Sequence, residues 1–121
     1  MDLSKFGRFV RTFSEGEIIA REGQPSVGWY ILLSGRVGVF KRDLQIADFT
    51  KTGTIFGELS TILDQPRSAT LKALTSTDVI YIESDLNQLI ANHPDITRKV
   101  IINLAERLVK TTEDLARRES R

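Results

Sequence analysis

Short apolar runs separated by turn residues fill the first two thirds of the chain. One run extends from Trp29 to Leu33 without a polar interruption, as in a buried strand, and Ser34-Gly35 ends it. From Val37 to Lys41 the residues alternate in character, which is typical of a strand with two unlike faces. Three more short runs are typical of strands: Ile18–Ala20, Ile46–Phe49 and Val79–Ile82. A further strand is expected to end at Phe56. Turn signals recur roughly every ten residues, which favours an all-β sandwich or barrel over βαβ units.

The last third of the chain has a helical period instead. Ser84 is a capping residue type and predicts a helix from there to about Asn92, since Pro94 disfavours helical geometry at the residue before it. A longer helix is predicted from Asp95 onward. Its apolar positions are spaced by three and four residues and form one face: Ile96, Val100, Leu104, Leu108 and Leu115, flanked by Ile101 and Val109. We expect this stripe to pack on the β part and to pair with a second copy.

These patterns predict a mainly β fold with helices. We expect a β-roll, similar to a jelly roll, over about residues 12–82, with a short helix inside it. Helices follow over about residues 84–118, the last one long, and a chain of 121 residues suffices for one domain, 1–121. Residues 1–10 predict a short leading helix with Phe6, Phe9 and Val10 as its apolar positions.

Charge and cysteine content exclude several classes of function. The formal net charge is +1, from 17 basic and 16 acidic residues, which argues against a dedicated nucleic-acid-binding protein. The chain has no cysteine, so disulfides, thiol catalysis and cysteine-based metal sites are excluded. No apolar run is long enough to span a bilayer and the start has no signal-peptide core, so we expect a cytoplasmic protein that binds no membrane.

The segment from Phe56 to Ala73 holds the candidate chemistry. Gly57 permits a tight turn and close approach of a ligand, and Glu58–Leu63 can form one or two helical turns whose free N–H groups favour an anion. Pro66 fixes the return of the chain. Arg67 has a planar fork of donors suited to phosphate oxygens, Ser68 adds a hydroxyl and Ala69 leaves room. These residues predict a phosphate site, and Glu58 beside it suits a sugar hydroxyl.

This segment resembles the phosphate-binding cassette of the cyclic-nucleotide-binding domain family. The matching residues are Phe56-Gly57-Glu58-Leu59 and, after a short variable stretch, Pro66-Arg67-Ser68-Ala69-Thr70. The sequence is most similar to the sensor half of catabolite-activator-type transcription factors and to the domains of cyclic-nucleotide-dependent kinases. Upstream, four segments resemble the glycine framework of the family's β-roll: Gly16-Glu17, Glu22-Gly23, Tyr30-Ile31-Leu32 and Ser34-Gly35-Arg36-Val37.

The resemblance implies a ligand and a set of contacts. The ligand would be cAMP or cGMP, with cAMP favoured, and no metal. Glu58 would accept the ribose 2′-hydroxyl, the N–H groups near Leu59 and Ser60 would face the cyclic phosphate, Arg67 would pair with its charge, and Ser68 would bond phosphate or base. In activator-type relatives an arginine and a hydroxyl pair of the long helix contact the base, and Arg107, Thr111 and Thr112 occupy the matching places. The ligand would then bridge the cassette and the long helix and act as a switch.

Three features depart from the family pattern. The hairpin around Lys41-Arg42-Asp43-Leu44 is short, which alters the edge of the predicted pocket. Gly53-Thr54 precedes the cassette where the family often has Gly-Asp. No helix-turn-helix and no kinase region follows, so the sequence does not identify an output.

Other functions remain as alternatives. The chain has no Ser-His-Asp set, no Cys-His pair and no metal-spaced histidines, so we expect no enzyme. A cupin-like sugar enzyme would need metal-binding histidines, and the single His93 suits a link between helices instead. The main alternative is a roll of the same family that has lost ligand binding and serves as an interaction or dimerisation module. The sequence leaves the choice between cAMP and cGMP open.

Overall fold

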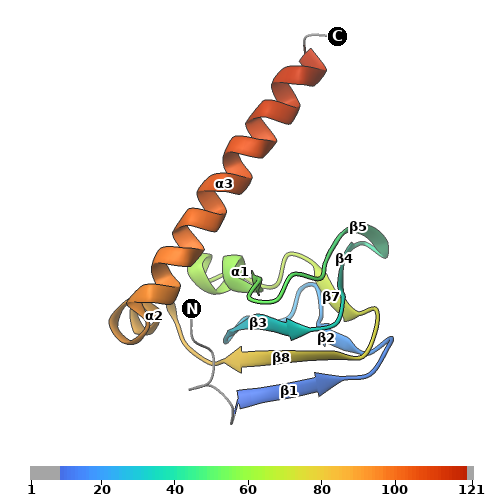
Figure 1. Cartoon of the computed structure of the whole chain (residues 1–121), viewed down its shortest axis with the longest axis vertical. Helices are drawn as coiled ribbons and strands as arrows, with labels where there is room; N and C mark the ends of the chain where they lie inside the picture. Colours follow the sequence, from blue (N-terminus) through green and yellow to red (C-terminus); the bar gives the residue numbers. More distant parts are fainter. Residues whose placement is uncertain (1–8, 120–121) are drawn as a thin grey trace. The chain divides into compact units, whose positions relative to one another are not determined.

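Two four-stranded antiparallel sheets form the first part of the chain in the computed structural model, which describes residues 9–119 (Figure 1). One sheet has the strand order β1-β8-β3-β6 and the other β2-β7-β4-β5. The strands are β1 (Val10–Phe13), β2 (Ile18–Ala20), β3 (Trp29–Ser34), β4 (Val37–Lys41), β5 (Leu44–Phe49), β6 (Ile55–Phe56), β7 (Thr70–Ala73) and β8 (Thr77–Ile82). The helices are α1 (Glu58–Leu63), α2 (Leu86–Asn92) and α3 (Pro94–Glu119). The predicted β-roll with a short inner helix and a long C-terminal helix is confirmed.

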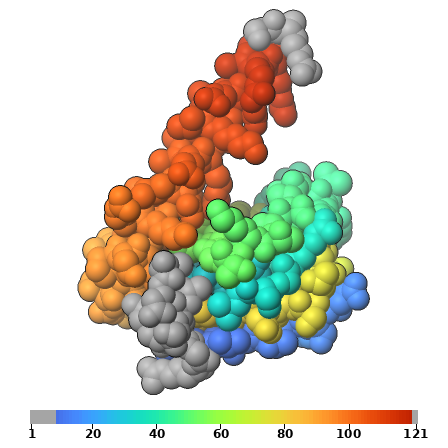
Figure 2. Space-filling model, in the orientation of Figure 1, coloured from blue at the N-terminus to red at the C-terminus, as the bar shows by residue number. Residues whose placement is uncertain are grey.

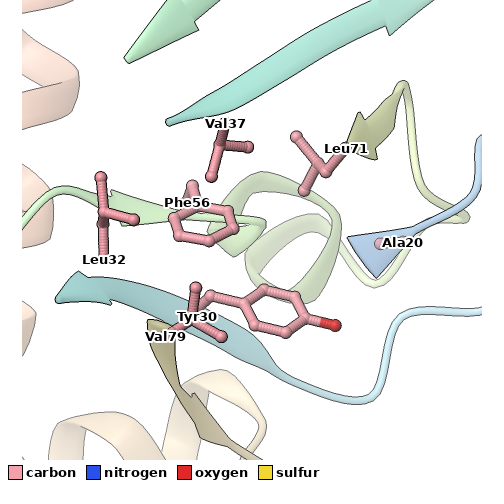
Figure 3. Close-up of a cluster of buried hydrophobic side chains, with 7 residues drawn as sticks. All are labelled: Ala20, Tyr30, Leu32, Val37, Phe56, Leu71 and Val79. Carbon is pink, nitrogen blue, oxygen red and sulfur yellow. The ribbon is translucent and has the colours of Figure 1, made fainter. Parts of the chain in front are cut away.

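The hydrophobic core lies between the two sheets. Its seven clustered buried side chains come from strands of both sheets (Figure 3): Ala20, Tyr30, Leu32, Val37, Phe56, Leu71 and Val79. Strand β3 is paired on both sides, with β8 and β6, and its residues from Trp29 to Leu32 are at most 5% exposed. A strand that is covered on both faces explains the uninterrupted apolar run in the sequence.

The hairpin between β4 and β5 turns in only two residues. Arg42 has φ 50° and Asp43 has φ 66°, and positive φ at both central residues defines the tight turn that suits the twist of a hairpin. Strand β5 is an edge strand, and Ile46 is an extra residue in its pairing, since Gln45 lies opposite Phe40 and Ala47 opposite Val39. This irregularity is a β-bulge.

The structure corrects three details of the predicted elements. Val10 belongs to strand β1 rather than to a leading helix, while residues 1–8 of that predicted helix lie outside the described residues. Strand β7 was not foreseen as a strand of its own. Helix α2 begins at Leu86, and Ser84 lies before it, buried, where its Oγ accepts a hydrogen bond of 2.9 Å from the Trp29 indole N–H.

The chain divides into two compact units, residues 1–87 and 88–121. In the second unit Pro94 occupies the first turn of α3, where its missing N–H would have no partner in the helix. Of the predicted apolar stripe of this helix, Ile96 and Val100 are buried, whereas Leu108 and Leu115 are 68% and 56% exposed. The later part of the stripe is thus exposed within this chain, and its expected pairing with a second copy stays a prediction. Among the helices described, none is long and apolar enough to cross a membrane.

Candidate functional site

The segment from Phe56 to Thr70, which we call the cassette, has a turn and a helix where its residues predict them. Strand β6 ends at Phe56, Gly57 turns the chain with φ 75°, and α1 occupies Glu58–Leu63. Asp64 ends the helix in a left-handed conformation with φ 51°. Figure 2 shows the part around α1, in green, at the surface beside the cyan of β3, and α1 contacts β3. The cassette is therefore a strand–turn–helix unit that lies on the roll.

Both the backbone conformation and the close packing around position 57 require a glycine. Its positive φ lies in the left-handed region, which favours glycine. A Cβ at this position would lie 2.8 Å from Nη1 of Arg67 and 3.1 Å from Cδ2 of Tyr30. The backbone of the turn therefore lies against the guanidinium, and a side chain here would displace it.

The Arg67 guanidinium points into the protein. The residue is 6% exposed, and its Nη1 donates to the Gly57 carbonyl at 2.6 Å and to Ser60 Oγ at 3.2 Å. Its Nη2 donates to the Gly28 carbonyl at 2.8 Å. A guanidinium has five N–H donors, so these bonds leave the Nε–H and one Nη2 hydrogen for other acceptors. We expected this side chain to be held for a phosphate, and the structure shows it held by neutral oxygens.

The positive charge of Arg67 has no counter-charge within residues 9–119. None of the ion pairs among them includes this residue, and all of its partners are carbonyls, a hydroxyl and a ring. A buried charge without a counter-charge is costly, because hydrogen bonds to neutral groups replace only part of its hydration. An anion bound beside Arg67 would therefore supply a counter-charge that none of these partners provides.

Tyr30 lies beneath the guanidinium and stays neutral. Its ring centroid is 5.6 Å from Cζ of Arg67, and it stacks on Phe56 with centroids 5.1 Å apart (Figure 3). Burial raises the pKa of the Tyr30 phenol above its ordinary value, and the charges of Arg67 and Arg11 oppose this shift without reversing it. The ring attracts the cation through its face but supplies no anion.

Gly28 joins the cassette to the end of the loop before β3. Its carbonyl accepts from Arg67 and also from Thr61 Oγ1, at 2.8 Å, and the Thr61 hydroxyl bonds Ser26 Oγ at 2.7 Å. Gly28 itself has no room for a side chain, since a Cβ would lie 2.6 Å from the Ile82 carbonyl oxygen. Both the helix and the arginine of the cassette are thus anchored on one backbone oxygen.

The predicted site residues of the first unit lie together in the cassette. Phe56, Glu58 and Ser60 are buried, Leu59 is 41% exposed, Ser68 is exposed and Ala69 is half-buried. Gly28, Tyr30 and the side chain of Lys41, which bonds the Ser68 carbonyl, were not predicted to contact the cassette. In the sequence, Tyr30 is marked as part of the glycine framework, and Lys41 as part of the short hairpin at the edge of the predicted pocket.

The predicted site residues of α3 belong to the second unit. Arg107, Thr111 and Thr112 are exposed, and Thr112 Oγ1 donates to the Leu108 carbonyl of its own helix at 2.9 Å. Their contact with a base stays a prediction. Among residues 9–119, no three acidic, histidine or cysteine side chains gather as a metal ion would require.

Comparison with known proteins identifies the family. A family model described as the cyclic nucleotide-binding domain matches residues 10–93, which include both sheets and the whole cassette. The chain belongs to the cyclic nucleotide-binding domain family. Domains of this family are regulatory and bind ligands, so the domain itself is not a catalytic one.

Individual relatives of this cyclic nucleotide-binding domain agree in sequence and fold. A CRP-like cAMP-activated global transcriptional regulator of Mycobacterium tuberculosis is 30% identical over 109 residues, which cover 86% of this chain and 49% of the regulator. The catabolite activator protein of Thermus thermophilus has a TM-score of 0.75 at 27% identity, over 88% of this chain and 52% of that one. A structure from a cyclic-GMP-dependent signalling pathway of bacterial phytopathogenesis has a TM-score of 0.70 at 25% identity, over 89% and 91%. The chain thus spans about half the length of the first two proteins.

Proposed function

We propose that this domain binds a cyclic nucleotide, cAMP in preference to cGMP, and serves as a regulatory sensor. The observation that carries the proposal is the buried guanidinium of Arg67, which has no carboxylate partner among residues 9–119. A cyclic phosphate has one negative charge and two exposed oxygens. It would supply the missing counter-charge and accept from the two N–H groups of Arg67 that the protein leaves unused.

Other cassette residues have complementary roles in this proposal. Gly57 lets the backbone approach the ligand, and the N–H groups of Leu59 and Ser60 in the first turn of α1 face the phosphate. Glu58 is buried at the start of α1, where its carboxylate would accept a hydrogen bond from the ribose 2′-hydroxyl. A phosphate that binds Arg67 has to displace the carbonyls of Gly57 and Gly28 from the guanidinium or to bond the Nε–H and the second Nη2 hydrogen, which these carbonyls do not use.

The preference for cAMP rests on relatives. The Mycobacterium tuberculosis regulator is named for activation by cAMP, and several regulatory subunits of cAMP-dependent protein kinases are related to this chain. The relative from a cyclic-GMP-dependent pathway makes cGMP the competing ligand. Ser68, which is exposed, offers a hydroxyl to a phosphate or to a guanine edge, so direct competition between the two nucleotides decides the preference.

We expect cAMP to stabilise the full chain against heat. A ligand that binds only the folded state adds about 2.7 kcal/mol to the free energy of unfolding at a hundred times its dissociation constant. The measurement is the melting temperature in titrations with cAMP and cGMP, with adenosine as the ligand that lacks a phosphate. We expect cAMP to raise the melting temperature at a lower concentration than cGMP or adenosine does.

Mass spectrometry of the purified protein tests ligand binding independently, because a tightly bound nucleotide would remain on the protein through purification. A melting temperature that no cyclic nucleotide changes, together with a protein free of nucleotide, would reject the sensor function. An equal or larger effect of cGMP would keep the sensor but reject the preference.

The second candidate function is a dimerisation module, and exposed apolar side chains of α3 favour it. Ile101, Leu108 and Leu115 are spaced by seven residues and are 62%, 68% and 56% exposed. An apolar residue at every seventh position is the repeat by which two helices pair in a coiled coil. Three such residues on one exposed face are costly for a helix that stays single in water.

We expect Leu108→Glu to make a dimer dissociate, because it places two like charges in the centre of the paired helices. Sedimentation equilibrium of the wild-type chain and the variant measures this, with Glu106→Gln, which changes a charge on the same exposed helix, as the control. A wild-type chain that is monomeric at high micromolar concentration would exclude this module.

A further inference from the structure

A lysine of the β4–β5 hairpin holds the backbone of the cassette directly after Arg67. Lys41 Nζ donates to the Ser68 carbonyl at 2.6 Å and lies 3.2 Å from Glu22 Oε2. The other carboxylate oxygen of Glu22 accepts from the Arg42 N–H at 3.1 Å. These bonds lower the pKa of Glu22, the backbone bond from Arg42 most strongly, because they stabilise its charged form. The Glu22 carboxylate, held by the Arg42 N–H, therefore holds Lys41 in place at the end of the hairpin.

The loop after β2 holds the same stretch of the cassette through backbone bonds. The Gly23 N–H donates to the Arg67 carbonyl and the Arg67 N–H donates to the Gln24 carbonyl, both at 2.8 Å. The Glu22 N–H donates to Thr70 Oγ1 at 3.0 Å. Glu22 thus takes part in both sets of bonds, and it links the hairpin, the loop and the cassette.

These contacts fix the direction of two backbone N–H groups. In a trans peptide the carbonyl of one residue and the N–H of the next lie in one plane and point in opposite directions, and none of the described peptides is cis. With the Arg67 carbonyl directed to Gly23 and the Ser68 carbonyl to Lys41, the N–H groups of Ser68 and Ala69 point away from these donors. Neither N–H has a hydrogen-bond partner within the described part of the chain. Both are next to the arginine that has no counter-charge.

We propose that Lys41 and Glu22 act as positioning residues, which hold the peptide planes after Arg67 so that the Ser68 and Ala69 N–H groups face the phosphate of the ligand. The inference rests on the proposed function and deepens it. The side chain of Lys41 acts through the Ser68 carbonyl, at 2.6 Å, and not by touching the nucleotide. It therefore affects ligands with a phosphate and leaves recognition of the nucleoside part unchanged.

The test is the affinity of the full chain and its variants for cAMP and for adenosine, measured by calorimetry. Lys41→Met keeps the length of the side chain and removes its donors, and we expect about tenfold weaker cAMP binding, roughly the effect of one lost hydrogen bond. Affinity for adenosine should not change. The matched control is Lys51→Met, which changes an exposed lysine outside these bonds.

Glu22→Gln separates positioning from a simple effect of charge. Removal of a negative charge near an anion site would strengthen cAMP binding if Lys41 and Glu22 acted only through their charges. A positioning role predicts the opposite, weaker binding, because Lys41 loses its ion pair. Tighter binding in Glu22→Gln, or equal losses for cAMP and adenosine in Lys41→Met, would overturn the proposal.

Amide signals of the ligand-free protein keep this test independent of the proposed function. In ¹H–¹⁵N NMR spectra we expect Lys41→Met to shift the Ser68 and Ala69 signals, and Lys51→Met to leave them in place. Unshifted signals would overturn the positioning role even if cAMP binds. A wild-type chain that binds no cyclic nucleotide would reject the proposed function and with it the ligand-directed role, while the spectra would still show whether Lys41 orients the peptides.

Discussion

Arg67→Ala is expected to weaken cAMP binding by about 2–5 kcal/mol, the range for loss of one partner of a buried charge pair. The reason is that the guanidinium is the buried positive charge of the cassette and would provide the counter-charge to the phosphate. The same variant leaves the Gly57 carbonyl without its arginine donor, whereas the Gly28 carbonyl keeps its bond from Thr61. The loss should therefore fall mainly on binding, with a smaller loss of stability.

Calorimetric titration with cAMP measures the effect, at a temperature where circular dichroism shows the variant to be folded. Arg36→Ala is the matched control, since it removes an exposed arginine that is ion-paired with Asp48. Arg67→Lys keeps the charge but cannot bond both the Gly57 and Gly28 carbonyls through a planar fork, so we expect it to recover only part of the affinity. Unchanged affinity in a folded Arg67→Ala protein would reject the assignment of this site.

Gly57→Ala is expected to lower the free energy of unfolding by about 2–3 kcal/mol, the sum of backbone strain and a steric contact. The strain comes from φ 75°, and the contact comes from a new Cβ that would lie 2.8 Å from Nη1 of Arg67. The guanidinium has to move to make room. We therefore expect weaker cAMP binding in addition to the loss of stability.

Gly53→Ala is the control for the strain alone. Gly53 has φ 90°, and a Cβ there would have nothing within 4 Å, so this variant should cost only about 1–2 kcal/mol and leave binding unchanged. Urea denaturation of both variants gives the difference due to the contact with Arg67. If the two alanine variants were equally stable and bound cAMP equally well, the crowding at Gly57 would have no role in the site.

Sequence alone predicted the cassette in detail because its structure depends on local chemistry. The glycine turn, the six-residue helix and the proline before Arg67 each follow from backbone preferences of nearby residues. Strand β7 was missed because its partners, β2 and β4, are distant in the sequence. Strand β1 was missed because Val10 is apolar among neighbours whose pattern also fits a helix, and tertiary pairing with β8 overrides that pattern.

The partners of Arg67 could not be predicted for a different reason. Two of them are backbone carbonyls, of Gly28 and Gly57, and every residue has a carbonyl, so no residue type marks them. The sequence predicted that Arg67 would be held for an anion, and the fold reveals which neutral groups hold the side chain. Lys41 was recognised only as part of a short hairpin, because the link to Ser68 spans 27 positions in the sequence.

The bulge at Ile46 has a consequence for solubility at high concentration. Strand β5 is one of the two edge strands of its sheet, and its residues Leu44 and Ile46 are 68% and 57% exposed. An exposed apolar edge strand favours edge-to-edge aggregation of separate molecules. The extra residue interrupts the regular hydrogen-bond ladder of β5. The edge therefore lacks a continuous row of donors and acceptors with which a strand of another molecule could pair. Deleting Ile46 would straighten the edge and favour self-association into insoluble material.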